Sequence, residues 1–208
     1  MRTYKDEKNN VLLLVLCCVI SFIMIFLSEG FIAAGTVREE CLRLHVLAAS
    51  DSEADQDVKL RVRDAILTGT GDLFSSCGTA SEAVERAAEE KDKIKNIAEN
   101  VLRENGFGYG AEVYIQEEYF GTRQYDGVTL PAGNYTALKV ILGSGGGHNW
   151  WCVMFPPLCL PAVTEGSEDS VYGAFGENGG NLVTGKNGYK VKFRIVEIVE
   201  NIIEALKS

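Results

Sequence analysis

The amino-terminal part of the chain is dominated by an uninterrupted apolar run, VLLLVLCCVISFIMIFL, at residues 11–27. As an α-helix this run is about 25 Å long, slightly short of a bilayer's hydrocarbon core and slightly long for the core of a signal peptide. The polar segment 1–10 carries Arg2, Lys5 and Lys8, which favours its retention in the cytoplasm. We therefore expect a signal peptide or membrane anchor at 11–27 that exports the rest of the chain.

The residues after this run divide into a short linker, 28–37, and one extracytoplasmic domain, 38–208. Small residues in SEG and FIAA would let signal peptidase cut after Gly30 or after Ala34, and the sequence leaves open whether the leader is removed or retained. The length that remains is that of a single domain with a sizeable core.

Alternating apolar and polar positions predict a β-strand in CLRLHVLA, residues 41–48. Leu42 and Leu44 lie on its apolar side, and Arg43 and His45 on the other, as in a half-buried strand. By similar patterns we expect further strands at 111–120, 135–143 and 150–155, the last of them buried on both faces.

Helical periodicity follows the first strand. Ser52 with Asp55 three residues on is a helix start signal, and Gly69 is a plausible stop. A longer helix is expected from Thr79 to Gly106, and an amphipathic helix at the carboxyl end in VKFRIVEIVENIIEALKS. The glycine-rich stretches GSGGGHN and GAFGENGGN are expected to be loops, the first a flexible hairpin connection.

The patterns together predict an α+β fold with a single exported domain. We expect a mixed or antiparallel sheet of about four strands with two to three packed helices, preceded by the apolar amino-terminal helix.

Composition excludes several classes of function. The net charge of −9 argues against nucleic acid as a partner, because phosphate binding needs a clustered basic surface. The chain has no GxxxxGK[ST] or GxGxxG motif for nucleotides. It has no CxxC or HExxH, and its histidines are His45 and His148, so we expect no metal site and no cofactor.

The corner ASDSEAD, between the first strand and the first helix, admits three interpretations: a catalytic site, an anion cradle or a structural joint. Ser50, His45 and Asp51 could form a nucleophile system, but residues so close in sequence rarely converge on one reacting atom. Carboxylates around the helix start, at Glu53, Asp55 and Asp57, would repel a phosphate. We favour a joint that could also present a recognition surface.

Two segments carry a resemblance to a known family. LRLHVLAASDSEADQDVKLRVRDAIL and PAGNYTALKVILGSGGGHNWWCVMFPPLC resemble the signature of the stage II sporulation protein R family of endospore-forming Firmicutes. The resemblance is continuous over residues 38–160. It departs at Ala49, where the family usually has asparagine, and between Pro161 and the final helix, which suggests a variable loop.

The resemblance implies a signalling protein that acts by binding and is not an enzyme. Members of the family are exported from the forespore into the space that faces the mother cell. There they activate a membrane-embedded aspartic protease of the stage II sporulation protein GA type, which processes the pro-sigma-E factor.

The resemblance also implies which residues carry the function. From the first segment these are Arg43, Ser50, Asp51, Ser52, Asp55, Gln56, Lys59, Arg63 and Asp64. From the second they are Asn149, Trp150, Trp151, Cys152, Phe155, Pro156, Pro157 and Cys159.

The double proline of NWWCVMFPPLC ends its strand, because proline cannot continue the hydrogen-bonded ladder. Phe155–Pro156 and Pro156–Pro157 are both candidates for a cis bond. We expect Val153 and Phe155 in the core, and at least one tryptophan and the Pro-Pro-Leu turn to form an exposed apolar patch for the protease.

The exported cysteines allow one or two disulfides. Cys152 and Cys159 could bridge around the double proline, with reduced and buried thiols as the alternative. A bridge between Cys41 and Cys77 would require the loop that carries Cys77 to fold back to the first strand.

Two other functions remain open on the sequence. An exported hydrolase acting on cell wall or peptide would need His148, Asp51 and a nucleophile to converge, which their spacing does not support. A structural component of the spore envelope would need no such constellation.

Overall fold

The structure is a computed structural model that describes residues 4–125, 127–157, 167–186 and 188–207. The helices are α1 (Tyr4–Glu39), α2 (Glu53–Ser75), α3 (Ala80–Glu89), α4 (Lys91–Glu104), α5 (Ser167–Thr184) and α6 (Tyr189–Lys207). The strands are β1 (Leu42–Leu47), β2 (Ala111–Phe120), β3 (Arg123–Tyr125), β4 (Val128–Leu130), β5 (Gly133–Leu142) and β6 (Asn149–Phe155).

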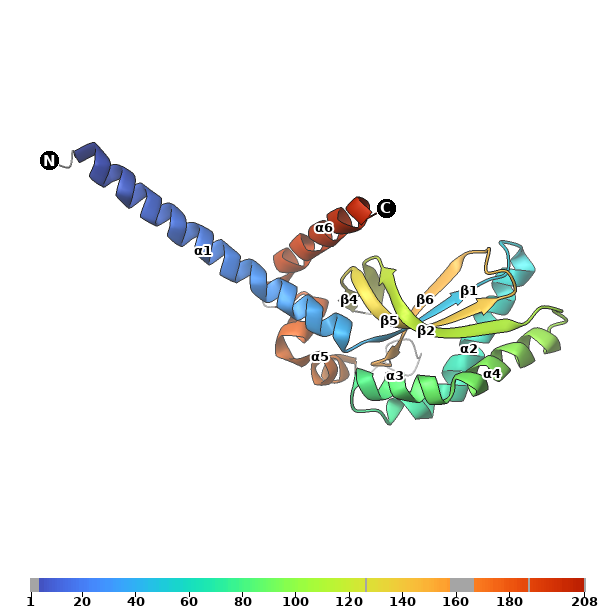
Figure 1. Ribbon diagram of the computed structural model, residues 1–208. Helices are drawn as coiled ribbons and strands as arrows, with labels where there is room; N and C mark the ends of the chain where they lie inside the picture. Colours follow the sequence, from blue (N-terminus) through green and yellow to red (C-terminus); the bar gives the residue numbers. More distant parts are fainter. Residues whose placement is uncertain (1–3, 126, 158–166, 187, 208) are drawn as a thin grey trace.

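Four of the strands form one mixed sheet in the order β2-β5-β1-β6 (Figure 1). Strand β1 runs parallel to β5 and antiparallel to β6, and β2 runs antiparallel to β5. The predicted α+β fold with a sheet of about four strands is therefore confirmed. The hairpin of β3 and β4 was not expected, because strands of three residues carry too little alternation to recognise.

Helices cover both faces of this sheet, and five of the six residues of β1 are buried. On one face α2, α3 and α4 pack against residues such as Leu44 and Val140. On the other face the end of α1, α5 and the β3–β4 hairpin surround residues such as Ala137 and Val153. Arg43 and His45 therefore lie in the interior, and the expected half-buried strand is wrong.

The helix boundaries differ from the expected ones in three places. Helix α2 continues past Gly69, because Thr70 and Phe74 extend its buried face. The long helix expected from Thr79 is divided at Glu90 into α3 and α4. GAFGENGGN is not a loop but part of α5, with a kink where Gly176 has a φ of 64°. The cap at Ser52 and the positive φ of Gly106 agree with the prediction.

Helix α1 projects from the sheet domain and holds the amino-terminal apolar run (Figure 1). Within the described ranges one helix, over Asn9–Glu39, is long and apolar enough to cross a membrane. Residues 28–37, for which we expected a linker, are its last turns. Ala33 and Ala34 are buried there against Phe193 and Val196 of α6, so this end of α1 belongs to the fold.

Candidate functional site

The corner between β1 and α2 is closed by the capping residues of the helix. The Ser52 hydroxyl accepts the Asp55 N–H at 3.2 Å. The Asp55 carboxylate, buried beneath the corner, accepts hydrogen bonds from the hydroxyls of Ser50 and Tyr109. These bonds hold the pKa of Asp55 below its usual range, because they stabilise the ionised form. This half of the corner is the structural joint that the sequence favours.

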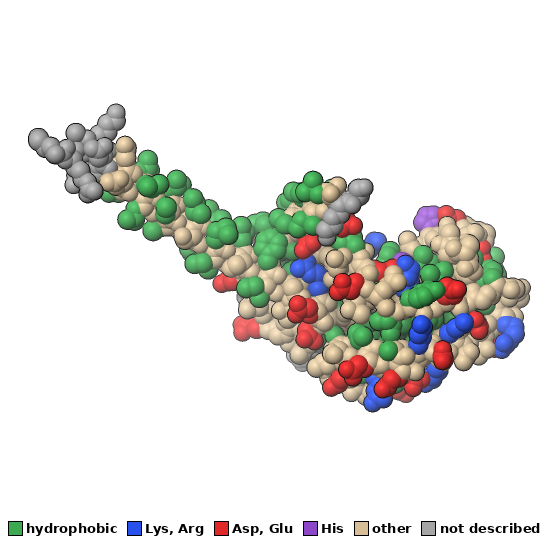
Figure 2. Space-filling view, viewed as in Figure 1, with side chains coloured by type: hydrophobic (Ala, Val, Ile, Leu, Met, Phe, Trp, Pro, Cys, Tyr) green, Lys and Arg blue, Asp and Glu red, His purple; other side chains and the backbone are tan. Residues whose placement is uncertain are grey.

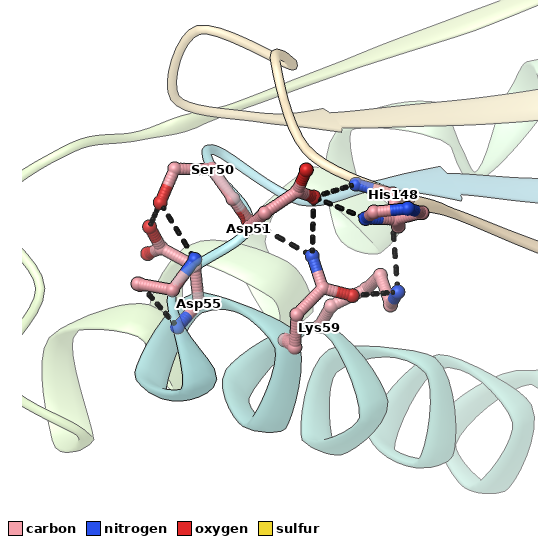
Figure 3. Close-up of polar contacts among 7 residues, drawn as sticks. Ser50, Asp51, Asp55, Lys59 and His148 are labelled. Carbon is pink, nitrogen blue, oxygen red and sulfur yellow. Dashed lines mark hydrogen bonds and ion pairs between the residues drawn. The ribbon is translucent and has the colours of Figure 1, made fainter.

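The other half of the corner carries an exposed pair, Asp51 and His148 (Figure 3). One carboxylate oxygen of Asp51 accepts the backbone N–H of His148 at 2.6 Å and is also hydrogen-bonded to the ring Nδ1. These two contacts lower the pKa of Asp51. The side chains are 56% and 78% exposed, so the pair can be reached by another molecule.

Lys59 lies beneath this pair (Figure 3), and hydrogen bonds of Lys59 and Gln56 connect the start of α2 to it. The ammonium of Lys59 donates to the Gln56 side-chain oxygen at 2.6 Å and to the carbonyl of His148 at 3.0 Å. The Gln56 amide donates to the carbonyl of Ser50 at 2.9 Å. Lys59 is buried, and desolvation lowers its pKa although the charge of Asp51 acts in the opposite direction.

The glycine-rich loop at 143–148 is attached to the corner. The N–H groups of Gly146 and Gly147 donate to the carbonyls of Ala49 and Ala48 at 3.2 and 3.0 Å. A Cβ on Gly147 would overlap the carbonyl group of Ser50, so only glycine allows the two backbones to approach this closely. The expected hairpin connection is wrong, because β1 lies between β5 and β6 in the sheet; the loop crosses over the end of β1 and is hydrogen-bonded to the corner.

Arg43 lies on β1 away from the corner and has a structural role. Its side chain is fully buried, with Nε donating to the Cys152 carbonyl at 3.0 Å and Nη2 donating to the Tyr125 hydroxyl at 2.7 Å. The guanidinium also lies 4.3 Å from the centroid of the Phe120 ring. An arginine enclosed by aromatic rings in this way is stabilised by cation–π contact and holds the hairpin to the sheet.

His45 also belongs to the interior. Its ring lies 2.6 Å from the Glu118 carboxylate and 2.8 Å from the Asn149 side-chain oxygen, and it stacks on Trp151 at 3.6 Å between centroids. Burial acts to raise the pKa of Glu118, but hydrogen bonds from Lys139 and His45 outweigh it and lower the pKa. The possible Ser50–His45–Asp51 system is therefore not assembled.

The described apolar residues of the second segment are buried or half-buried, and the expected apolar patch, which includes Leu158, remains a prediction. Trp150 is half-buried under the guanidinium of Arg63, 4.2 Å from its ring, and Arg63 is paired with Asp64. Trp151 is half-buried against His45, and Phe155 is buried as expected. Pro156 is buried, Pro157 is half-buried, and Leu158 lies outside the described residues. The Phe155–Pro156 bond is cis, one of the two candidates.

The cysteines agree with one of the two possible bridges. Cys152 is disulfide-bonded, while Cys159, its expected partner, lies outside the described residues. Cys41 and Cys77 are free thiols, so the second possible bridge is wrong. Cys41 packs in the core on the α5 face of the sheet and Cys77 packs against the core on the α2 face, which separates them. Burial raises the pKa of Cys41 to about 12.

The site brings together an aspartate and a histidine that we did not expect to meet. In the described part of the chain, however, the His148 ring is hydrogen-bonded to Asp51 and to no serine, threonine or cysteine side chain. No set of three His, Cys, Asp or Glu side chains that could hold a metal occurs among the described residues. The arrangement offers a carboxylate and an imidazole for hydrogen bonding, above a base held by the bonds of Lys59 and Gln56.

Sequence reasoning missed several partners of the site. Tyr109, which contacts Asp55, and Glu118, which contacts His45, lie outside both segments that carry the resemblance. Nothing in the sequence around them indicates these contacts. His148 lies within the second segment, but the sequence raises it only as a possible metal ligand and as a hydrolase residue. The close approach of loop 143–148 explains its role, and the three consecutive glycines before it were the available signal.

Two comparisons with known proteins point to one family. The model of the family described as stage II sporulation protein R matches residues 38–165. Stage II sporulation protein R of Bacillus subtilis (strain 168) is 34% identical over 130 residues, which are 62% of this chain and 58% of the relative. The match thus spans less than two thirds of the length of that relative, and no solved structure matches the chain. The matched residues include both segments that build the corner, and the chain belongs to the stage II sporulation protein R family.

Proposed function

We propose that this protein is a sporulation signal that is anchored by α1 and acts beyond the membrane on a protease. Arg2, Lys5 and Lys8 would keep the amino terminus of α1 in the cytoplasm of the forespore. The sheet domain then faces the space between forespore and mother cell. There it activates a membrane-embedded aspartic protease of the stage II sporulation protein GA type, which processes the pro-sigma-E factor. Family membership supports the sporulation role.

The observation that carries this proposal is the exposed Asp51–His148 pair, which is held from below by hydrogen bonds of buried side chains. The pair joins two segments far apart in the chain, and buried contacts of Asp55 and Lys59 hold both in place. Little conformational entropy remains to be lost there on binding, which favours recognition by a partner. Asp51, Ser52 and Asn149 are exposed on the same corner, whereas Arg43 and Pro156 are buried and would act through the fold alone.

Activation by binding requires no bond-breaking group in this chain. A ligand that binds the active arrangement of a protease more tightly than the inactive one shifts the population towards the active one. The corner would supply such differential contacts through a carboxylate, an imidazole and the hydroxyl of Ser52.

The test is reconstitution of processing in a host that does not sporulate. This chain, the protease and the sigma precursor are co-expressed, and shortening of the precursor is measured by gel shift. We expect shortening only when all three are present, and at least a tenfold loss with Asp51→Ala. Asp57→Ala removes an exposed carboxylate in the first turns of α2, outside the hydrogen-bonded cluster; it is the matched control and should process normally. Normal processing with Asp51→Ala would remove the corner from the proposal, and no shortening at all would remove the activator.

The contact of Asp51 with His148 also gives the hydrolase alternative a specific basis. Because no nucleophile side chain meets the ring in the described residues, such an enzyme would need His148 to activate a water molecule. Release of soluble fragments from purified peptidoglycan by the full chain, abolished by His148→Gln, would favour this alternative over activation.

A further inference from the structure

Helix α6 leaves one apolar face uncovered over its whole length. Val191, Ile198, Ile202 and Leu206 are 58%, 58%, 54% and 82% exposed, and with half-buried Ile195 they follow helical spacing along one side. No charged residue interrupts this stripe, which we call the α6 stripe. An exposed apolar surface of this kind marks a contact with a partner or a membrane.

The first turn of α6 packs beside the end of the apolar run of α1. The ammonium of Lys192 is ion-paired with Glu29 and lies 4.8 Å from the centroid of the Phe26 ring. Glu29 is the first charged residue after the run at 11–27, so the membrane surface has to lie near it if α1 spans the bilayer. Ile32, about one turn after Glu29, is 67% exposed, so the exposed apolar surface of α1 continues past Glu29.

The opposite side of α6 packs on the part of α1 that follows Glu29. Phe193 and Val196 contact the buried Ala33 and Ala34, and Glu200 is paired with Arg38 at 2.8 Å. The α6 stripe therefore faces away from this end of α1. Helix α6 runs across the direction of α1, and in Figure 2 the hydrophobic surface of α1 continues onto it.

From these observations we infer that α6 is an interfacial helix, which lies on the membrane beside α1 with the α6 stripe among the lipid chains. A helix with one apolar and one polar side binds a bilayer in this orientation, and the neighbouring anchor holds it at the surface. Lys190 and Arg194, exposed beside the stripe, lie where lysine and arginine reach anionic headgroups. The inference rests on α1 as a membrane anchor, which is part of the proposed function.

The corner lies apart from the anchor and from the start of α6. Strand β1 begins beside the end of α1 and runs away from it, so the Asp51–His148 pair lies at the far end of the sheet from α1 (Figure 1).

Quenching by brominated lipids in nanodiscs that hold one copy of the full chain tests the inference. Ile202→Trp is compared with Asn201→Trp, an exposed polar neighbour outside the stripe, after subtraction of the fluorescence of Trp150 and Trp151 in the parent. Lipids brominated near the headgroup end of the chain should quench Ile202→Trp at least twofold more than Asn201→Trp. Circular dichroism checks that each variant folds as the parent does.

A third variant separates this inference from the anchor. Ile20→Trp, on the exposed apolar surface of α1, should be quenched by deeply brominated lipids if α1 spans the bilayer. If Ile20→Trp is quenched while Ile202→Trp and Asn201→Trp are quenched equally and weakly, the interfacial helix is overturned. The anchor then remains supported. A blue shift of Ile202→Trp that requires several copies in one disc assigns the stripe to a second copy of the chain and also overturns the inference.

Discussion

The carboxylate of Asp51 accepts hydrogen bonds from both the backbone and the ring of His148, which ties the start of α2 to the loop before β6. Replacing Asp51 with asparagine removes the charge that strengthens these bonds. We expect amide exchange in residues 143–148 to become roughly tenfold faster while the rest of the domain is unchanged. Hydrogen–deuterium exchange of the full chain measures it. Asp64→Asn, an exposed carboxylate on α2 bonded to Arg63, is the control and should leave this loop unaffected.

Acidic pH should destabilise the domain. The pKa values of Asp51, Asp55 and Glu118 are all lowered in the folded state, so these groups bind fewer protons when folded than when unfolded. Their stabilising effect is present above their unfolded pKa values of about 3.9 to 4.3, and it is lost as the pH falls through the folded ones. The urea midpoint should fall from pH 7 to about pH 3, and less so in Asp55→Asn. An unchanged midpoint would contradict the assignment.

Gly147→Ala should destabilise the corner much more than Gly146→Ala. A Cβ at Gly147 overlaps the Ser50 backbone, whereas one at Gly146 stays 3.4 Å from the Ala49 carbonyl oxygen. Overpacking of this kind costs about 1–3 kcal/mol, and a rigid backbone neighbour places Gly147→Ala at the upper end. Urea unfolding of both variants measures the difference. Equal stabilities would show that the loop can move away from Ser50.

Arg43→Lys should destabilise the domain despite keeping the positive charge. A lysine cannot satisfy the Cys152 carbonyl and the Tyr125 hydroxyl together or lie flat against Phe120. The loss should be about 2–4 kcal/mol, from unsatisfied buried groups and lost packing. Since Arg43 is remote from the corner, processing by the folded fraction should be normal. Reduced processing at full stability would instead indicate a direct role for Arg43.

The sequence predicted the elements whose signals are local. Alternation located the four main strands, and the cap signals at Ser52 and Thr79 located two helix starts, because each rests on neighbouring residues. Helix α5 was missed, because its glycines suggest a loop and only burial of residues such as Val171 and Phe175 makes it helical.

The candidate site was less predictable, since its contacts are between distant segments. The sequence marked Asp51 and Ser52 at a corner, but their neighbour His148 depends on the antiparallel pairing of β1 with β6. The same pairing buries Arg43 and His45, which alternation placed on the polar side of a half-buried strand, and leaves Trp151 half-buried. The type of a residue indicates that it needs a polar partner, but the pairing of the strands determines whether that partner lies in the interior or at the surface.

The position of β1 in the middle of the sheet has a consequence for how the domain is made. Leu44 pairs with Leu138 of β5 on one side and with Cys152 of β6 on the other. Strand β1 is synthesised first, but it can pair only after β5 and β6, the last two strands, have been made. Contacts so distant in sequence fold slowly, because the intervening chain must be ordered before they form. A chain of this kind remains unfolded until β6 has been synthesised. An unfolded chain can pass through a narrow export channel, whereas a domain that folded early would block it.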